Sequence, residues 1–171
     1  MKDGFIKIAS ATPDIRVADT EFNVSNIISI IKEAYNKGAK LIVFPELCIT
    51  AYTCSDLFLQ RSLLEGALDG LNNIKKATEN IDITAVVGLP VAVGDMLYNC
   101  AAVVNHGHIK GLVPKLNIPN YGEFYEQRHF TEGTEEVRTI NILGEDVPFG
   151  SNILFRSSVM PEFVLGIEIC E

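Results

Sequence analysis

Three side chains with complementary reactivity each follow an apolar segment of this 171-residue chain. Glu46 comes directly after Leu-Ile-Val-Phe-Pro, Lys115 after Gly-Leu-Val-Pro, and Cys170 after Val-Leu-Gly-Ile-Glu-Ile. A thiol becomes a good nucleophile when a base removes its proton or a nearby cation favours the thiolate, and a carboxylate with an ammonium group could supply both effects. If the apolar segments are strands, their carboxyl ends are where sites gather in α/β sheets. The three residues therefore form a candidate for nucleophilic catalysis by cysteine.

Each of these residues also has a purely structural interpretation. Cys170 could be a small buried apolar residue, Glu46 a cap after a proline turn, and Lys115 a solvated loop charge. Residue types alone leave both interpretations open. The sequence does exclude several common enzyme classes, because it lacks the serine nucleophile elbow, the HExxH zinc motif, the phosphate-binding Walker loop and the GxGxxG dinucleotide motif.

The segments that must position these residues alternate between strand and helix patterns. The expected elements are a strand at 5–9, a helix at 20–37, a strand at 41–44, a helix at 57–79 and a strand at 84–89. The first helix has the clearest periodicity, and Gly38 ends it. We expect the second helix to be interrupted near Gly66 and Gly70, and the strand at 41–44 to be buried on both faces.

A hairpin and a long polar region follow. Strands predicted at 97–104 and 109–113 are joined by Asn105-His106-Gly107-His108, whose Asn and Gly favour a tight turn with both histidines exposed. A metal site at the two histidines would need partners that the neighbouring residues do not offer. Residues 114–150 are expected to form an irregular functional loop region. Further strands are expected at 153–155 and 163–169, which gives one α/β unit with a parallel or mixed sheet.

Composition excludes several functions. The formal net charge is −8 and no basic block is present, so neither nucleic acid nor an anionic membrane surface is an expected partner. No apolar run is long enough to span a membrane, and the first residues do not resemble a signal peptide, so a cytoplasmic location is expected. The four cysteines, at 48, 54, 100 and 170, are expected to be reduced thiols, and a zinc site at Cys48 and Cys54 is not expected.

Three longer stretches resemble one enzyme family. They are PELCITAYTCSDLF at 45–58, VPKLNIPNYGEFYEQRHF at 113–130 and GIEICE at 166–171. Together they resemble the nitrilase superfamily of carbon–nitrogen hydrolases, and more narrowly the glutaminase domain of glutamine-dependent NAD synthetases. The resemblance covers most of the chain from Phe5 onward, and the three reactive residues occur in the family's order. One departure is Ala51, where the family often has glycine.

The resemblance implies a role for each reactive residue. Glu46 would take the proton of the Cys170 thiol, and the sulfur would form a thioester with the side-chain amide carbon of glutamine. Lys115 and the backbone N–H of Glu171 would hold the oxyanion. Glu123 matches a second glutamate that positions the lysine and the substrate.

Two tyrosines match residues that line the family's glutamine pocket. These are Tyr52 and Tyr121, although either could equally be a packing residue. From the residues alone, Glu126 and Arg128 could form a structural ion pair, and Glu168 could face a polar interior or solvent.

The implied fold is an α-β-β-α sandwich, of which residues 1–171 would be the N-terminal part of a nitrilase-like glutamine amidohydrolase domain. The remainder of that domain, and a synthetase domain that uses ATP and magnesium to convert deamido-NAD to NAD, would lie outside this sequence. No metal or organic cofactor is expected on this chain, and a homo-oligomer is expected. Two alternatives stay open: a free-standing amidase or carbamoylase of the same superfamily, and a non-catalytic fragment. The isolated piece is expected to be inactive.

Overall fold

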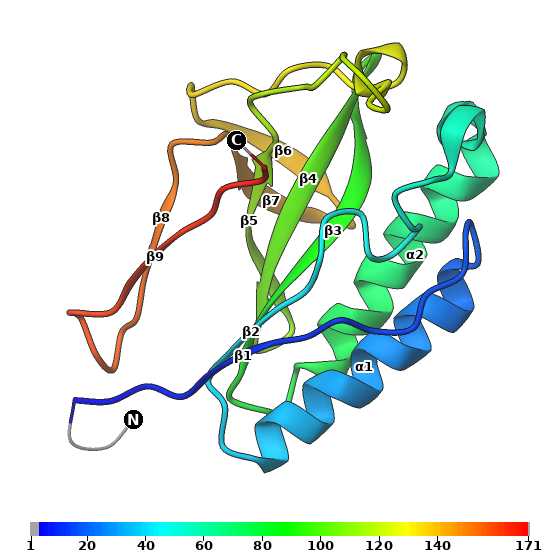
Figure 1. Ribbon diagram of the computed structural model, residues 1–171. Helices are drawn as coiled ribbons and strands as arrows, with labels where there is room; N and C mark the ends of the chain where they lie inside the picture. The colour runs from blue at the N-terminus through cyan, green and yellow to red at the C-terminus, as the bar shows by residue number, and fades with distance from the viewer. Residues whose placement is uncertain (1–3, 171) are drawn as a thin grey trace.

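A computed structural model describes residues 4–170 of the chain as one sheet covered by helices on one face and by a hairpin on the other (Figure 1). The elements, with η marking short 3₁₀ helices, are β1 (Ile8–Ser10), α1 (Thr20–Asn36), β2 (Leu41–Val43), η1 (Ser55–Leu59), α2 (Arg61–Ala77), β3 (Thr84–Val93), β4 (Met96–Asn105), β5 (His108–Pro114), η2 (Glu126–Arg128), β6 (Arg138–Ile142), β7 (Glu145–Phe149), β8 (Leu154–Arg156) and β9 (Val164–Gly166).

The main sheet is mixed, which is one of the two arrangements, parallel or mixed, that the strand and helix order predicts. Its seven strands lie in the order β1-β2-β3-β4-β5-β7-β6. The first three pair in parallel, and β3, β4 and β5 pair antiparallel as consecutive hairpins. β7 runs parallel to β5, and β6 closes the edge as its antiparallel partner. The α/β class is therefore confirmed, and the carboxyl ends of β2 and β5 carry Glu46 and Lys115.

The two helices pack side by side on one face of the sheet (Figure 1). Asp19 caps α1 by accepting a hydrogen bond from the Phe22 N–H. The predicted interruption of α2 at Gly66 and Gly70 is wrong, because the helix continues through both. A Cβ at Gly70 would lie 2.7 Å from Cγ2 of Val24 on α1, so glycine at this position allows the two helices to pack closely.

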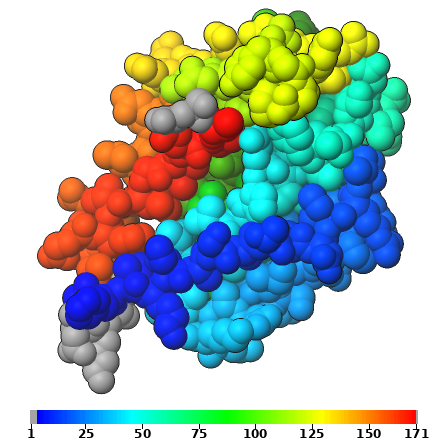
Figure 2. Space-filling view, viewed as in Figure 1, coloured from blue at the N-terminus to red at the C-terminus, as the bar shows by residue number. Residues whose placement is uncertain are grey.

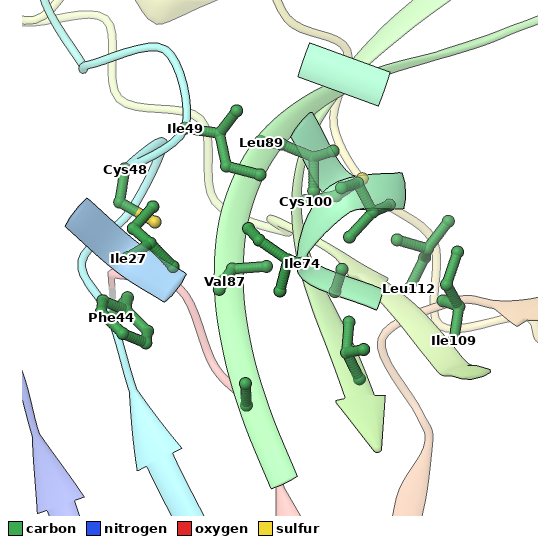
Figure 3. Close-up of a cluster of buried hydrophobic side chains, with 14 of the residues drawn as sticks. Ile27, Phe44, Cys48, Ile49, Ile74, Val87, Leu89, Cys100, Ile109 and Leu112 are labelled. Carbon is green, nitrogen blue, oxygen red and sulfur yellow. The ribbon is translucent and has the colours of Figure 1, made fainter. Parts of the chain in front are cut away.

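The core lies between the helices and the sheet (Figure 3). Ile27 and Ile74 from the helices meet Val87 and Leu89 of β3 and Leu112 of β5, and all five are fully buried. The β8–β9 hairpin and the segment after it pack on the opposite face of the sheet through Phe155, Phe163, Leu165, Ile167 and Ile169. Layers of helices, sheet and a second small sheet follow the first part of the expected α-β-β-α sandwich.

The expectation of an irregular region at 114–150 is wrong in part, because β6 and β7 form a hairpin within it. Leu143 and Gly144 both have positive φ angles, of 52° and 79°, and supply its two-residue turn. The predicted strand at 163–169 is shorter, since β9 ends at Gly166. Leu41 and Ile42 are buried against opposite faces of the sheet, as predicted for this strand, while Val43 at its end is 37% exposed.

The predicted turn at Asn105-His106-Gly107-His108 is confirmed. His106 and Gly107 have φ angles of 48° and 74°, and both histidines are exposed. Within residues 4–170, no helix is both long and apolar enough to cross a membrane.

Candidate active site

The backbone turn that carries Glu46 lies directly on β3. Leu47 has a φ of 51°, and a Cβ at Gly88 would come within 2.3 Å of the Leu47 nitrogen and 2.9 Å of the Glu46 carbonyl carbon. The Gly88 carbonyl accepts a hydrogen bond from the Ile49 N–H at 3.1 Å. Its N–H donates to Sγ of Cys48 at 3.4 Å. Because residue 88 is glycine, the turn that carries Glu46 can pack directly on β3, and this contact fixes its position at the end of β2.

Lys115 extends from the end of β5 into a pair of carboxylates. Its Nζ donates to Oε1 of Glu46 and to Oε1 of Glu126, each at 2.7 Å. The Lys115 side chain is only 1% exposed. Burial by itself would lower the pKa of the ammonium group, but the hydrogen bonds to Glu126 and Glu46 outweigh it, so the pKa is raised. Lys115 is therefore a fixed cation at the site.

The second carboxylate at Lys115 belongs to Glu126, not to the predicted Glu123. Glu126 begins η2, and its side chain is 5% exposed, whereas Glu123 is exposed and is not one of the two carboxylates to which Lys115 Nζ donates. The possible Glu126–Arg128 ion pair does not form either, because Arg128 binds Asp56. The sequence carried one signal for Glu126: Phe130, four residues later and buried, marks the inward face of a helical turn.

Glu46 and Glu126 differ in surroundings although they share one cation. Glu126 Oε1 also accepts a hydrogen bond from the Tyr52 hydroxyl at 2.7 Å. Glu46 is 23% exposed, and the two donors that it meets, Lys115 and Asn99, both bind its Oε1. Oε2 is the oxygen that these donors do not engage. Glu46 is thus the better placed of the two carboxylates to exchange a proton with a bound molecule.

The two predicted pocket tyrosines lie in different environments. Tyr52 joins the cluster through Glu126, and its pKa is raised by burial first and then by the carboxylates of Glu126 and Glu46 and by Cys170. Tyr121 is 70% exposed and packs edge-on against Phe124, with ring centroids 5.6 Å apart. Tyr121 is therefore outside the Lys115 cluster in this structure.

Cys170 is exposed at the end of the C-terminal segment, which lies on the molecular surface (Figure 2). Its φ is 45°, a strained value for a residue with a side chain. It lines a cavity of about 520 Å³ together with Pro114 and Leu116, the neighbours of Lys115. Glu168 lines the same cavity and is exposed. The thiol therefore shares a cavity with the segment that holds the lysine, while Glu171 lies outside the described residues.

The other three cysteines are buried in the core and differ sharply from Cys170. Burial raises the pKa of Cys48 to about 12 and also raises those of Cys54 and Cys100. Their thiols are therefore poor nucleophiles. No group of three or more His, Cys, Asp and Glu side chains within residues 4–170 is arranged to hold a metal ion.

Comparisons with known proteins identify the family of the chain. Residues 7–171 match the family model described as carbon–nitrogen hydrolase, and the chain belongs to that family. Among curated relatives, it is 39% identical over 170 residues to a glutamine-dependent NAD(+) synthetase of Mycobacterium tuberculosis, covering 98% of this chain. It is 35% identical over 144 residues to one of Aquifex aeolicus, covering 84% of this chain. The chain spans 25% of the length of each of these relatives.

Solved structures give the same result. A glutamine-dependent NAD(+) synthetase from Cytophaga hutchinsonii superposes with a TM-score of 0.84 and 35% identity, over 90% of this chain and 26% of that one. A Nesterenkonia amidase from the nitrilase superfamily superposes with a TM-score of 0.67 and 23% identity, over 84% of this chain and 54% of that one. The amidase likeness establishes the shared nitrilase-like fold.

Proposed function

We propose that this domain hydrolyses the side-chain amide of glutamine through a thioester on Cys170. The observation that carries the proposal is the buried Lys115 ammonium, held at 2.7 Å from both Glu46 and Glu126 beside the cavity that Cys170 lines. A fixed cation that needs no reorganisation can stabilise an oxyanion, and a partly exposed carboxylate can act as the base for a thiol.

The first half-reaction forms the thioester. Glu46 takes the proton from Sγ of Cys170, and the sulfur bonds to the amide carbon of the substrate. The carbonyl electron pair moves onto oxygen, where Lys115 stabilises the negative charge. As the intermediate collapses, the carbon–nitrogen bond breaks and the nitrogen takes the proton from Glu46, so ammonia leaves.

The second half-reaction releases the acid. Water attacks the thioester carbon while Glu46 accepts one of its protons, and the carbon–sulfur bond breaks in the resulting intermediate. Sγ then regains a proton from Glu46, and glutamate leaves. Glu126 takes no part in these transfers, because Lys115 and Tyr52 both bind it and its side chain is buried.

The choice of glutamine, and the use of the ammonia, rest on the relatives. These relatives are named as NAD(+) synthetases that depend on glutamine. We propose that the ammonia amidates deamido-NAD in a synthetase domain that uses ATP and magnesium. The chain spans a quarter of the length of these relatives, so the use of the ammonia is proposed for the whole protein.

The test is to incubate the natural full-length protein with an electrophilic glutamine analogue and to locate the label by peptide mass analysis. Label is expected on Cys170 and absent from the Cys170→Ser variant. Modification of Cys48, Cys54 or Cys100 with Cys170 unlabelled would overturn the assignment. Equal labelling by a simple aliphatic amide analogue would instead favour a general amidase of the same family.

A further inference from the structure

Asn99 is a buried polar residue in the otherwise apolar middle of β4, and its side chain lies between the two glutamates. Its Nδ2 donates to Oε1 of Glu46 at 2.5 Å and to Oε2 of Glu126 at 3.5 Å. The residue is 1% exposed. A side-chain amide carries two N–H hydrogens, so each carboxylate can receive one of them.

The backbone of the same residue holds the lysine. The Asn99 carbonyl accepts a hydrogen bond from the Lys115 N–H at 2.8 Å, one step beyond the last registered pair of β4 and β5. Asn99 therefore contacts Glu46, Glu126 and Lys115, and these three come from separate segments of the chain. Together the four residues close a ring: Lys115 bridges the carboxylates on one side and Asn99 bridges them on the other.

This arrangement is unfavourable for the carbonyl oxygen of the Asn99 side chain. Oδ1 of Asn99 is buried without a hydrogen-bond partner among the described residues. An unpaired buried oxygen is unfavourable, so the rest of the side chain must determine its orientation. The flipped amide would turn Oδ1 toward two carboxylates, which is worse because only acceptors would meet. The orientation therefore follows from the two glutamates.

We propose that Asn99 is a positioning residue for the reaction, which fixes Glu46 as the base and Glu126 as the support of Lys115. This inference rests on the proposed function of the site. Two carboxylates with a single ammonium leave one negative charge uncompensated in a largely buried place. A neutral amide offsets that charge with two partial positive hydrogens and, unlike a second cation, leaves Glu46 able to accept a proton.

A pH effect follows from the groups that face Glu46. Glu46 meets the Lys115 ammonium, at the end of β5, and the Asn99 amide from β4. The Glu126 carboxylate from η2 shares both donors, and the Tyr52 side chain interacts electrostatically with Glu46, Glu126 and Cys170. A donated hydrogen bond favours the charged form of a carboxylate. Loss of the amide should therefore move the acid limb of the activity profile to higher pH.

The experiment uses the natural full-length protein with Asn99→Leu, Asn99→Asp and the control Asn105→Leu. Asn105 lies at the other end of the same strand, and its Nδ2 donates to the Ile83 carbonyl and to Oγ1 of Thr84, each at 3.2 Å. Circular dichroism establishes that each variant folds. Glutamine hydrolysis gives kcat and KM against pH, and iodoacetamide gives the alkylation rate of Cys170 without any need for substrate.

Asn99→Leu should lower kcat by about 10- to 100-fold with little change in KM, slow Cys170 alkylation at neutral pH, and shift the acid limb upward. Asn99→Asp should be most impaired at high pH and recover as the pH falls, because the introduced carboxyl becomes a donor again when it is protonated. Asn105→Leu should change stability alone.

Two results would overturn the inference: a folded Asn99→Leu variant with the wild-type kcat, pH profile and alkylation rate, or an equal loss in Asn105→Leu. Failure of the proposed function would give a different experimental result. If the wild-type protein releases no ammonia from glutamine, the substrate assignment fails, and the alkylation rates alone then decide whether Asn99 positions the site.

Discussion

Gly88 lies directly against the backbone of Leu47, the residue that follows Glu46. A Cβ at Gly88 would come within 2.3 Å of the Leu47 nitrogen, closer than any two such atoms can pack. The contact joins the end of β2 to the middle of β3 and fixes where Glu46 leaves the sheet. Two hydrogen bonds add to this contact: the Ile49 N–H donates to the Gly88 carbonyl, and the Gly88 N–H donates to Sγ of Cys48.

Gly88→Ala should therefore damage both stability and turnover. The added methyl group must push the Glu46 turn away from β3, at a cost of about 1–3 kcal/mol in unfolding free energy. A displacement of the base by about 1 Å can reduce kcat by about 100-fold. Chemical denaturation and the hydrolysis rate per folded molecule measure the two effects.

The matched control is Gly66→Ala on α2. Its added Cβ would meet the Thr20 hydroxyl at 2.9 Å, and that side chain can rotate away. Gly66→Ala should leave kcat at the wild-type value. If Gly88→Ala were as active and stable as Gly66→Ala, the contact of the Glu46 turn with β3 would be needed neither for stability nor for positioning the base.

Lys115→Met should lose turnover more than substrate binding. Removal of one oxyanion donor lowers kcat by about 100- to 1000-fold, while KM should change far less. The variant should also be less stable by about 3–5 kcal/mol, because Glu46 and Glu126 would face each other without their shared cation. Steady-state kinetics on the folded fraction and denaturant titration separate the effects.

Lys75→Met serves as the control for that experiment. Lys75 also forms a partly buried ion pair, with Glu145 at 2.6 Å, but it lies on α2 away from Cys170. Loss of this pair should reduce stability without changing kcat. A Lys115→Met variant with normal kcat would contradict the role of the ammonium group.

The sequence was sufficient to predict an α/β unit with a parallel or mixed sheet, both helices and the β4–β5 turn, because buried periodicity and turn residues are local signals. Glu46 and Lys115 were predicted for the same reason, since each directly follows a strand. Glu126 was missed because it lies in a loop with two acidic candidates three residues apart, and only the η2 turn decides which one faces inward.

Other features depend on contacts between distant segments. In the sequence, Gly66 and Gly70 indicate a helix break, because glycine is a poor helix former. Only the packing of α1 against α2 shows why glycine occurs there inside a continuous helix. The β6–β7 hairpin was missed because its exposed positions are polar, which hid the alternating Ile140, Ile142, Val147 and Phe149. Ala51 has a φ of 73°, which explains in physical terms why glycine would suit the position where the resemblance departs.

Tyr52→Phe tests whether Tyr52 supports Glu126 or contacts substrate. The change removes the hydroxyl that donates to Glu126 Oε1 at 2.7 Å and keeps the ring. If support of Glu126 is its role, kcat should fall by about 10-fold while KM stays near the wild-type value. A raised KM with an unchanged kcat would assign Tyr52 to substrate binding instead. The exposed Tyr125→Phe is the matched control and should alter neither constant.

Asp56 should make the stability of the η1–η2 contact depend on pH. Arg128 donates to both carboxylate oxygens of Asp56, at 2.7 and 3.1 Å, and His129 lies 3.1 Å from one of them. The hydrogen bonds from Arg128 and then His129 hold the pKa of Asp56 well below its usual range. The folded state therefore favours the carboxylate. Its contribution is complete above the unfolded pKa of about 3.9 and is lost as the pH falls from there toward the lower folded value.

The difference in melting temperature between the wild-type protein and Asp56→Asn should accordingly be largest near neutral pH. It should begin to narrow below about pH 4, where the carboxyl of the unfolded chain becomes protonated, and should keep narrowing as the pH falls toward the lower pKa of the folded state. Asp95→Asn, in the exposed turn between β3 and β4, provides the comparison and should show no such convergence. High salt should narrow the Asp56 difference at neutral pH, because the pair is exposed to solvent. A difference that stayed constant from pH 3 to pH 7 would mean that Asp56 holds η2, and with it Glu126, by packing rather than by charge.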